Sequence, residues 1–206
     1  MNIAQCKLTL SQRKRLDILA AARAECLDAG FRDTSMDRIA ESAQVSKRTV
    51  YNHFPSKEAL FMAIAAQFME ELRQAINVAY SSDRSLDDQL TEIANREISQ
   101  VTQPDYIAMF RVFIAELGTF RDAFDDLLKD WNGSVDPLEC WIEAASNDGR
   151  LTVKNSALAA AQFYSLLKGS LFWPVLAGYR SSPPEHERDA VISEAVTMFL
   201  ARYESN

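Results

Sequence analysis

The sequence predicts an all-α protein. Apolar residues recur at spacings of three and four along almost the whole chain of 206 residues, which is the period of the α-helix. Runs of β-branched residues are short, and only six glycines and six prolines occur, several of them between one periodic segment and the next. We therefore expect about nine helices, which fall near residues 11–29, 35–43, 46–53, 56–80, 86–102, 105–117, 120–146, 155–172 and 185–204. Pro137 lies inside the seventh helix and should kink or split it.

The three helices nearest the N-terminus have clear start and stop signals. Gly30 is suited to end the first helix, because glycine readily adopts the left-handed conformation common just after a helix. Thr34 or Ser35 can cap the second helix, and Ser46 can cap the third after a tight turn at 44–45. Two short helices joined by a tight turn are typical of a helix-turn-helix motif.

The third helix presents a polar face that suits DNA. Rotation by 100° per residue from Val50, taken as the buried reference, places Arg48 and Asn52 on the opposite side, flanked by Thr49 and Tyr51. Side chains of these types form hydrogen bonds to base edges and phosphates, and a short helix fits the major groove of B-DNA. The pattern therefore predicts a recognition helix.

The charge of the chain is unevenly distributed. The whole sequence has a formal net charge of −7 and a pI near 4.9, which taken alone argues against a nucleic-acid binder. Residues 1–57 nevertheless hold ten basic and six acidic side chains, for a net charge of +4, and the remaining chain has a net charge of −11. A short helix with exposed basic residues is on its own usually a solvated surface. Here the caps, the turn, the paired helix and the basic charge all favour DNA binding.

The stretch from Ile18 to Phe61 resembles the DNA-binding domain of the TetR/AcrR family of bacterial transcriptional regulators, above all in its segment VSKRTVYNHFPSKE at 45–58. The resemblance implies base or phosphate contacts from Lys47, Arg48, Thr49 and Tyr51, phosphate contacts from Ser35, Ser46 and His53, and a phosphate clamp at Lys57. Asn52 joins this set because of its outward position. Two of these residues have a second interpretation, since His53 and Tyr51 can instead be packing residues.

The acidic remainder of the chain is rich in aromatic residues. The pattern from Phe110 to Trp173, with Gly149–Val153 before the eighth helix, resembles the AefR-like C-terminal subgroup of the same family. That resemblance implies a pocket for an apolar or amphipathic small molecule, for which the candidate lining residues are Phe110, Phe113, Leu117, Trp131, Trp141, Phe163 and Leu167. The alternative is that this aromatic stripe at helical spacing is ordinary core.

The last two helices carry apolar or small residues on more than one side. A helix that is apolar on two sides needs two partners. Family members pair these helices with their copies in a four-helix interface, so the resemblance implies a homodimer with candidate interface residues Ala161, Lys168, Val191, Ala195, Val196 and Phe199. The alternative is a terminal core helix without dimerisation. We expect a DNA-binding helix-turn-helix domain over 1–57 and a ligand-binding and dimerisation domain over 58–206, with the helix at 56–80 shared as a connector.

Several other classes of protein find little support. Three scattered cysteines and two histidines provide neither a disulfide framework nor a metal site, and no catalytic motif occurs, so we expect no enzyme, no metal and no cofactor. The apolar stretch 157–179 contains Lys168 and Pro174, which argue against a membrane span, and the N-terminus has no signal-peptide pattern. A cytoplasmic protein fits best.

These observations predict a ligand-responsive transcriptional repressor. It would bind a palindromic double-stranded DNA operator as a homodimer and be released by an apolar or amphipathic small molecule. The alternative is a helical, dimeric protein-interaction module without specific DNA binding. A salt titration separates the two, because binding to DNA weakens steeply as the salt concentration rises.

Overall fold

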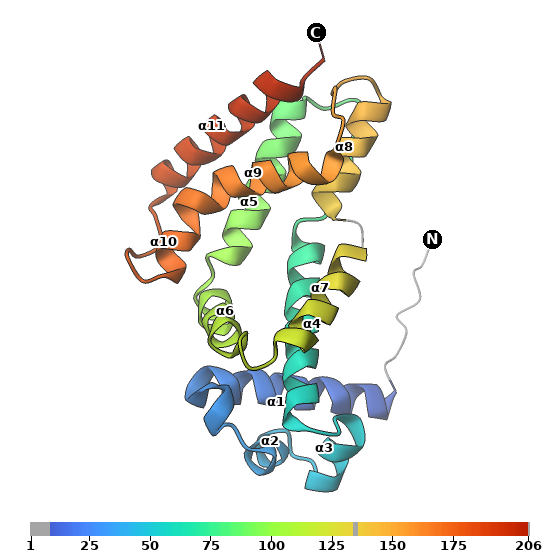
Figure 1. Cartoon of the computed structure of the whole chain (residues 1–206), viewed down its shortest axis with the longest axis vertical. Coiled ribbons are helices and arrows are strands. Elements are labelled where there is room, and N and C mark those ends of the chain that lie inside the picture. Colours follow the sequence, from blue (N-terminus) through green and yellow to red (C-terminus); the bar gives the residue numbers. More distant parts are fainter. Residues whose placement is uncertain (1–8, 134–135, 206) are drawn as a thin grey trace. The chain divides into compact units, whose positions relative to one another are not determined.

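The computed structural model describes residues 9–133 and 136–205, and the regular secondary structure of these residues is helical (Figure 1). The prediction of an all-α fold is confirmed. The described residues form eleven helices: α1 (Leu10–Asp33), α2 (Met36–Ser42), α3 (Lys47–His53), α4 (Lys57–Ala75), α5 (Leu86–Val101), α6 (Pro104–Glu116), α7 (Arg121–Gly133), α8 (Pro137–Asn147), α9 (Ser156–Leu171), α10 (Trp173–Leu176) and α11 (Glu185–Tyr203).

The two additional helices have local causes. The helix expected at 120–146 is split into α7 and α8, because Pro137 begins α8 and the carboxylate of Asp136 caps it by accepting from the backbone N–H of Leu138 at 2.8 Å. The short α10 was not expected. It follows a break at Phe172 and contains Pro174 in its first turn, where proline is tolerated.

The prediction that the first helix stops at Gly30 is confirmed, because this residue has non-helical angles (φ +77°, ψ 165°). Helix α1 continues beyond this kink only as one further turn up to Asp33. One predicted helix end was wrong. The fourth helix ends at Ala75 and not near residue 80. Beyond it the chain leaves the helical path, and the ring of Tyr80 packs edge-on against Trp141 with 5.8 Å between the centroids.

The chain forms two compact units. The first unit contains residues 9–68 and 111–127, and the second contains residues 69–110 and 128–205. Helices α4, α6 and α7 each contribute residues to both units. The domain boundary expected at residue 57 stays a prediction, since this division falls inside α4.

An aromatic cluster forms the core of the first unit. The buried ring of Phe61 in α4 lies 4.4 Å from that of Phe31, 5.3 Å from Phe113, 5.9 Å from Phe120 and 6.3 Å from Phe124 (centroid distances). Tilted and edge-on pairs of this kind are favourable arrangements of aromatic rings. The cluster therefore joins α4 to the end of α1 and to the segment 111–127.

In the second unit α11 packs against both α5 and α9, and α9 also packs against α8 (Figure 1). Trp141 of α8 is buried, and its Nε1 donates a hydrogen bond to Oε1 of the buried Gln89 at 3.2 Å. The Nε2 of Gln89 in turn donates to the carbonyl oxygen of Ser81 at 2.9 Å. This buried amide is therefore satisfied on both sides, as a polar group in a core must be.

None of the helices in the described ranges is both long enough and apolar enough to cross a bilayer. The apolar stretch at 157–179 is divided at Phe172, where α9 ends and α10 begins.

We expect Phe61→Ala to destabilise the protein by about 3–5 kcal/mol, because it removes a large buried ring and leaves a cavity among four other rings. The midpoint and slope of urea unfolding, followed by circular dichroism, measure the change. Leu10→Ala is the control, since Leu10 is exposed at the start of α1 and should change stability little. Similar losses in both variants would contradict the central role of Phe61.

Candidate nucleic-acid interface

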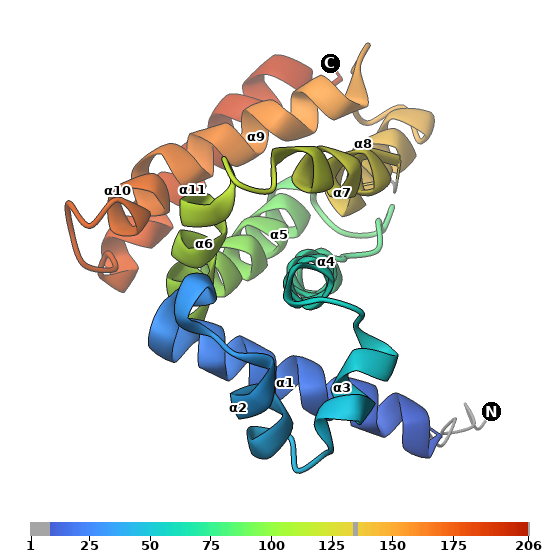
Figure 2. The same ribbon diagram turned by 60° about the horizontal axis from the view of Figure 1, so that its bottom comes forward.

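Helices α2 and α3 form the predicted helix-turn-helix, and α2 packs against both α1 and α3 (Figure 2). The Ser35 hydroxyl caps α2 by accepting from the backbone N–H of Arg38 at 3.2 Å, and the Ser46 hydroxyl caps α3 by accepting from that of Thr49 at 3.1 Å. Between the helices, Gln44 has a left-handed φ of +54°, which makes the tight turn. Both serines predicted to contact phosphate are thus positioned at helix N-termini.

The outer face of α3 is polar and accessible. Val50 is fully buried, while Arg48, Tyr51 and Asn52 are exposed, with 43% of Tyr51 accessible to solvent. Thr49 is half-buried, and its hydroxyl forms a hydrogen bond with that of Ser46 at 2.8 Å. Three side chains able to bond to base edges are therefore presented together on one short helix.

Lys47 at the start of α3 already has an anionic partner. Its Nζ lies 2.8 Å from Oδ1 and 2.9 Å from Oδ2 of Asp37 in α2. The hydrogen bond to this carboxylate, and its charge, raise the pKa of Lys47 above its usual value. Both side chains are exposed, so a phosphate that contacts Lys47 must compete with Asp37 for the same ammonium group.

Lys57, predicted as a phosphate clamp, has its ammonium group directed at the end of α1. Its Nζ donates to the carbonyl oxygens of Phe31 at 3.1 Å, Arg32 at 3.0 Å and Thr34 at 3.1 Å, and lies 4.5 Å from the ring centroid of Phe31. An ammonium group has three N–H donors, which these carbonyls can occupy. A phosphate contact from Lys57 stays a prediction, and here the side chain acts as a cap for α1.

The region around His53 contains a basic residue that sequence reasoning did not select. His53 is half-buried, and its carbonyl oxygen accepts from Nη1 of Arg15 at 3.5 Å. The guanidinium of Arg15 also lies 4.3 Å above the ring centroid of Phe54. This contact joins residues almost forty positions apart, so no local pattern indicates that Arg15 adds positive charge at the end of α3.

The predicted pocket residues are divided between the two units, and a pocket lined by them stays a prediction. Trp141, Phe163 and Leu167 are buried and Phe110 is half-buried, all in the second unit. Phe113 instead belongs to the aromatic cluster of the first unit, and Leu117 is 48% exposed. The side chain of Trp131 lies outside the described part of the structure.

The predicted dimer residues fall into two groups. Ala195, Val196 and Phe199 are buried within the chain itself, and Val191 is half-buried. Ala161 is exposed, and Lys168 is half-buried, with its Nζ 2.6 Å from Oε1 of Glu97.

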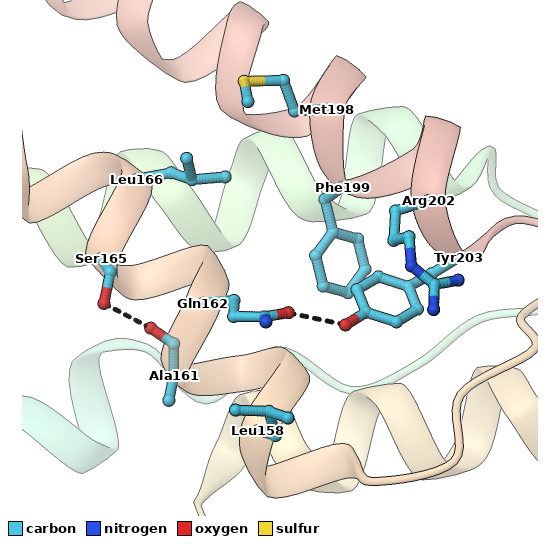
Figure 3. A pocket seen from close by; sticks show the side chains of 9 residues that line it. All are labelled: Leu158, Ala161, Gln162, Ser165, Leu166, Met198, Phe199, Arg202 and Tyr203. Carbon is cyan, nitrogen blue, oxygen red and sulfur yellow. Dashed lines mark hydrogen bonds between the residues drawn. The ribbon is translucent and has the colours of Figure 1, made fainter.

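An open groove of about 500 Å³ lies between α9 and α11 (Figure 3). Its lining is mostly apolar, and Leu158 and Met198 on its walls are 53% and 55% exposed. The Tyr203 hydroxyl donates to Oε1 of Gln162 at 2.6 Å across it. The residues that line it are Leu158, Ala161, Gln162, Ser165, Leu166, Met198, Phe199, Arg202 and Tyr203.

Within the described ranges, no group of three or more histidine, cysteine, aspartate or glutamate side chains is arranged to hold a metal ion.

Both parts of the chain match known families. Residues 18–64 match the bacterial regulatory proteins of the tetR family, and residues 88–205 match the C-terminal domain of AefR-like transcriptional repressors. A segment of 62 residues is 45% identical to the HTH-type transcriptional regulator UidR of Escherichia coli K12. That match covers 30% of this chain and 32% of UidR, so the chain spans about a third of the length of the curated relative.

Solved structures are similar over almost the whole chain. A TetR family transcriptional regulator from Pseudomonas syringae pv. tomato DC3000 is 37% identical with a TM-score of 0.75, and the match covers 97% of this chain and all of that one. The flavonoid-responsive regulator FrrA is 28% identical with a TM-score of 0.78, covering 94% of this chain and 98% of FrrA. The chain therefore belongs to the TetR family and is a DNA-binding transcriptional regulator with an AefR-like C-terminal domain.

Proposed function

We propose that the protein is a cytoplasmic repressor that binds a palindromic operator as a homodimer and releases it when an apolar or amphipathic small molecule binds its C-terminal domain. The observation that carries the DNA-binding part is the exposed face of α3, where Arg48, Tyr51 and Asn52 project from a helix capped by Ser46. This helix lies in the segment with a net charge of +4, which suits a polyanionic partner.

The groove between α9 and α11 supports the homodimer. Leu158 and Met198 expose large apolar side chains there, and an exposed apolar patch commonly marks a protein interface. A two-fold axis through such an interface makes the same surface complementary to itself. The two copies of α3 would then read half-sites about one turn of DNA apart, which is the geometry of a palindromic operator.

Helices that contribute to both units support the ligand response. Residues of α4, α6 and α7 pack in the first unit at one end and in the second unit at the other. A small molecule bound in the second unit can lower operator affinity only if it binds the DNA-competent state less tightly than the other state. The name of the related regulator FrrA, flavonoid-responsive, supports an aromatic effector.

In vitro selection of DNA bound by the purified full-length protein tests this proposal. We expect a palindromic motif, and log K for that DNA should fall linearly with log salt concentration. Recovery of no enriched motif would favour a protein-interaction module in place of a repressor.

We expect Tyr51→Ala and Lys47→Ala each to weaken binding to the selected operator by at least about tenfold, because each removes a base or phosphate contact. Fluorescence anisotropy with labelled operator measures the affinity, and circular dichroism checks the fold. Tyr179→Ala is the matched control, since Tyr179 is an almost fully exposed tyrosine of the second unit. Loss of helical structure in the Tyr51 variant would instead indicate a packing role.

We expect Asp37→Asn to strengthen DNA binding by about two- to fivefold, because it frees Lys47 from an exposed ion pair. The same anisotropy assay at low and moderate salt measures the change. Asp33→Asn removes an equal charge from an exposed position at the end of α1 and separates the local effect from that of net charge. Equal gains in the two variants would show that Asp37 does not restrain Lys47.

We expect Leu158→Glu and Met198→Glu each to convert the dimer to a monomer, because they place a charge in the proposed apolar interface. Sedimentation velocity over a range of protein concentrations measures the oligomeric state. Leu10→Glu, at an exposed position outside the groove, should leave the dimer intact. A wild-type protein that is monomeric at all concentrations would refute the proposed interface.

A further inference from the structure

Glu97 of α5 is a buried carboxylate in the interior of the second unit. The residue is fully buried, and burial of a charged group is costly unless partners compensate it. Lys168 reaches it from α9, with its Nζ 2.6 Å from Oε1 of Glu97, while 24% of the Lys168 side chain remains accessible to solvent. The negative charge therefore has one cation beside it, and the pair is close to neutral overall.

The second oxygen of Glu97 has no such partner. Its Oε2 is inaccessible to solvent and accepts no hydrogen bond from the described residues. An ionised carboxylate can accept about four hydrogen bonds, and buried polar atoms without any are rare in folded proteins. Since the charge is already balanced by Lys168, what Oε2 lacks is a neutral hydrogen-bond donor.

Two tyrosines lie near this carboxylate, of which Tyr106 is buried and Tyr164 is half-buried. Burial raises the pKa of Tyr106 above its usual range, and the charge of Glu97 raises it further. Burial likewise raises the pKa of Tyr164, with contributions from Asp136 and Glu97. The hydroxyl of Tyr164 donates to Oδ1 of Asp136 at 3.1 Å, so its single proton is directed away from Glu97.

Aromatic rings continue from Tyr106 toward the surface of the second unit. Tyr106 stacks on Phe110 with an interplanar angle of 16°, and Phe172 packs edge-on against Phe110 at 5.4 Å between centroids. Trp173 follows at 5.0 Å from Phe172 and is exposed. This row combines flat apolar surfaces with the unpartnered acceptor near Tyr106, a combination typical of small-molecule sites.

We infer that Glu97 is the polar anchor of the effector site and that the effector is a neutral aromatic molecule bearing a hydroxyl group, which donates to Oε2. The inference rests on the proposed ligand response and specifies its chemistry. An anionic effector would be repelled by Glu97, and a cationic one would add a second positive charge beside Lys168. Tyr106, Phe110 and Phe172 would pack against the aromatic part of the molecule.

The probes that test it are 4-hexylphenol and its methyl ether, 4-hexylanisole, which differ in the hydroxyl donor. Isothermal titration of the full-length protein without DNA should show the phenol binding at least about tenfold more tightly, because a site built around a hydrogen bond discriminates against ligands that lack it. Equal affinities, or no measurable binding of the phenol up to its solubility limit, would overturn the inference.

The variants separate this role of Glu97 from a structural one. Glu97→Gln should reduce the preference for the phenol, and the double variant Glu97→Met/Lys168→Met should abolish it. The double variant also avoids a fold problem, because replacing both members of a buried ion pair by apolar residues is often tolerated. Asp88→Asn, at an exposed position on the same helix, should keep the wild-type preference. If the double variant kept the wild-type preference for the phenol, a group other than Glu97 would recognise the hydroxyl. In that case Oε2 of Glu97 in the wild-type protein would bind only water.

A measurement of operator affinity separates the role of Glu97 in ligand binding from the proposed release of DNA. Operator affinity is measured by anisotropy with and without each probe. If the phenol binds through Glu97 but does not release the operator, the role of Glu97 in binding is supported. The proposal that ligand binding releases the operator is then refuted. If both probes release the operator equally well, the ligand response stands and the role of Glu97 is refuted.

Discussion

The ring of Phe61 is the contact on which the first unit depends. It packs against rings from the end of α1, from α6 and from the start of the α7 segment, so one buried side chain connects parts of the chain that are distant in sequence. Helix α3, the proposed recognition helix, is joined to α4 by only three residues. Fixing α4 by its aromatic core therefore also restricts where α3 can lie, before any DNA is bound.

The end of α1 is held in place by a second set of contacts. Lys57 donates to three carbonyl oxygens there, and the guanidinium of Arg32 pairs with the buried carboxylate of Glu116 in α6 at 3.0 Å. Breaking a pair of this kind is costly because it leaves a poorly solvated charge on Glu116. The last residues of α6 are thus bound to the first unit by both aromatic and ionic contacts. A change in α6 therefore bears directly on the helices that hold α3.

Local features of the sequence could be predicted, and features that depend on distant contacts could not. The caps at Ser35 and Ser46, the break at Pro137 and the outward face of α3 each depend on a few neighbouring residues, and sequence spacing identified them. The partners of Lys47 and Lys57 depend on tertiary packing, which no spacing rule specifies. For the same reason Phe113, expected among the pocket residues, lies in the aromatic core of the first unit. The buried positions of Ala195, Val196 and Phe199 show that apolar periodicity in α11 does not reveal which side faces the chain's own core.

The ion pairs of the DNA-binding region also bear on how salt should affect recognition. Counting all basic residues of segment 1–57 as phosphate ligands would overstate the number of counterions released, because Lys47, Arg32 and Arg38 already pair with carboxylates. Each such residue that binds a phosphate must exchange one anionic partner for another, which reduces its net contribution. Arg48 is exposed on α3 beside Tyr51 and Asn52. It is not among the residues that form an ion pair with a carboxylate in the described part of the chain, so it can bind a phosphate without first giving up such a partner. Specific affinity should therefore depend more on hydrogen bonds from the exposed face of α3 than on the net charge of the segment.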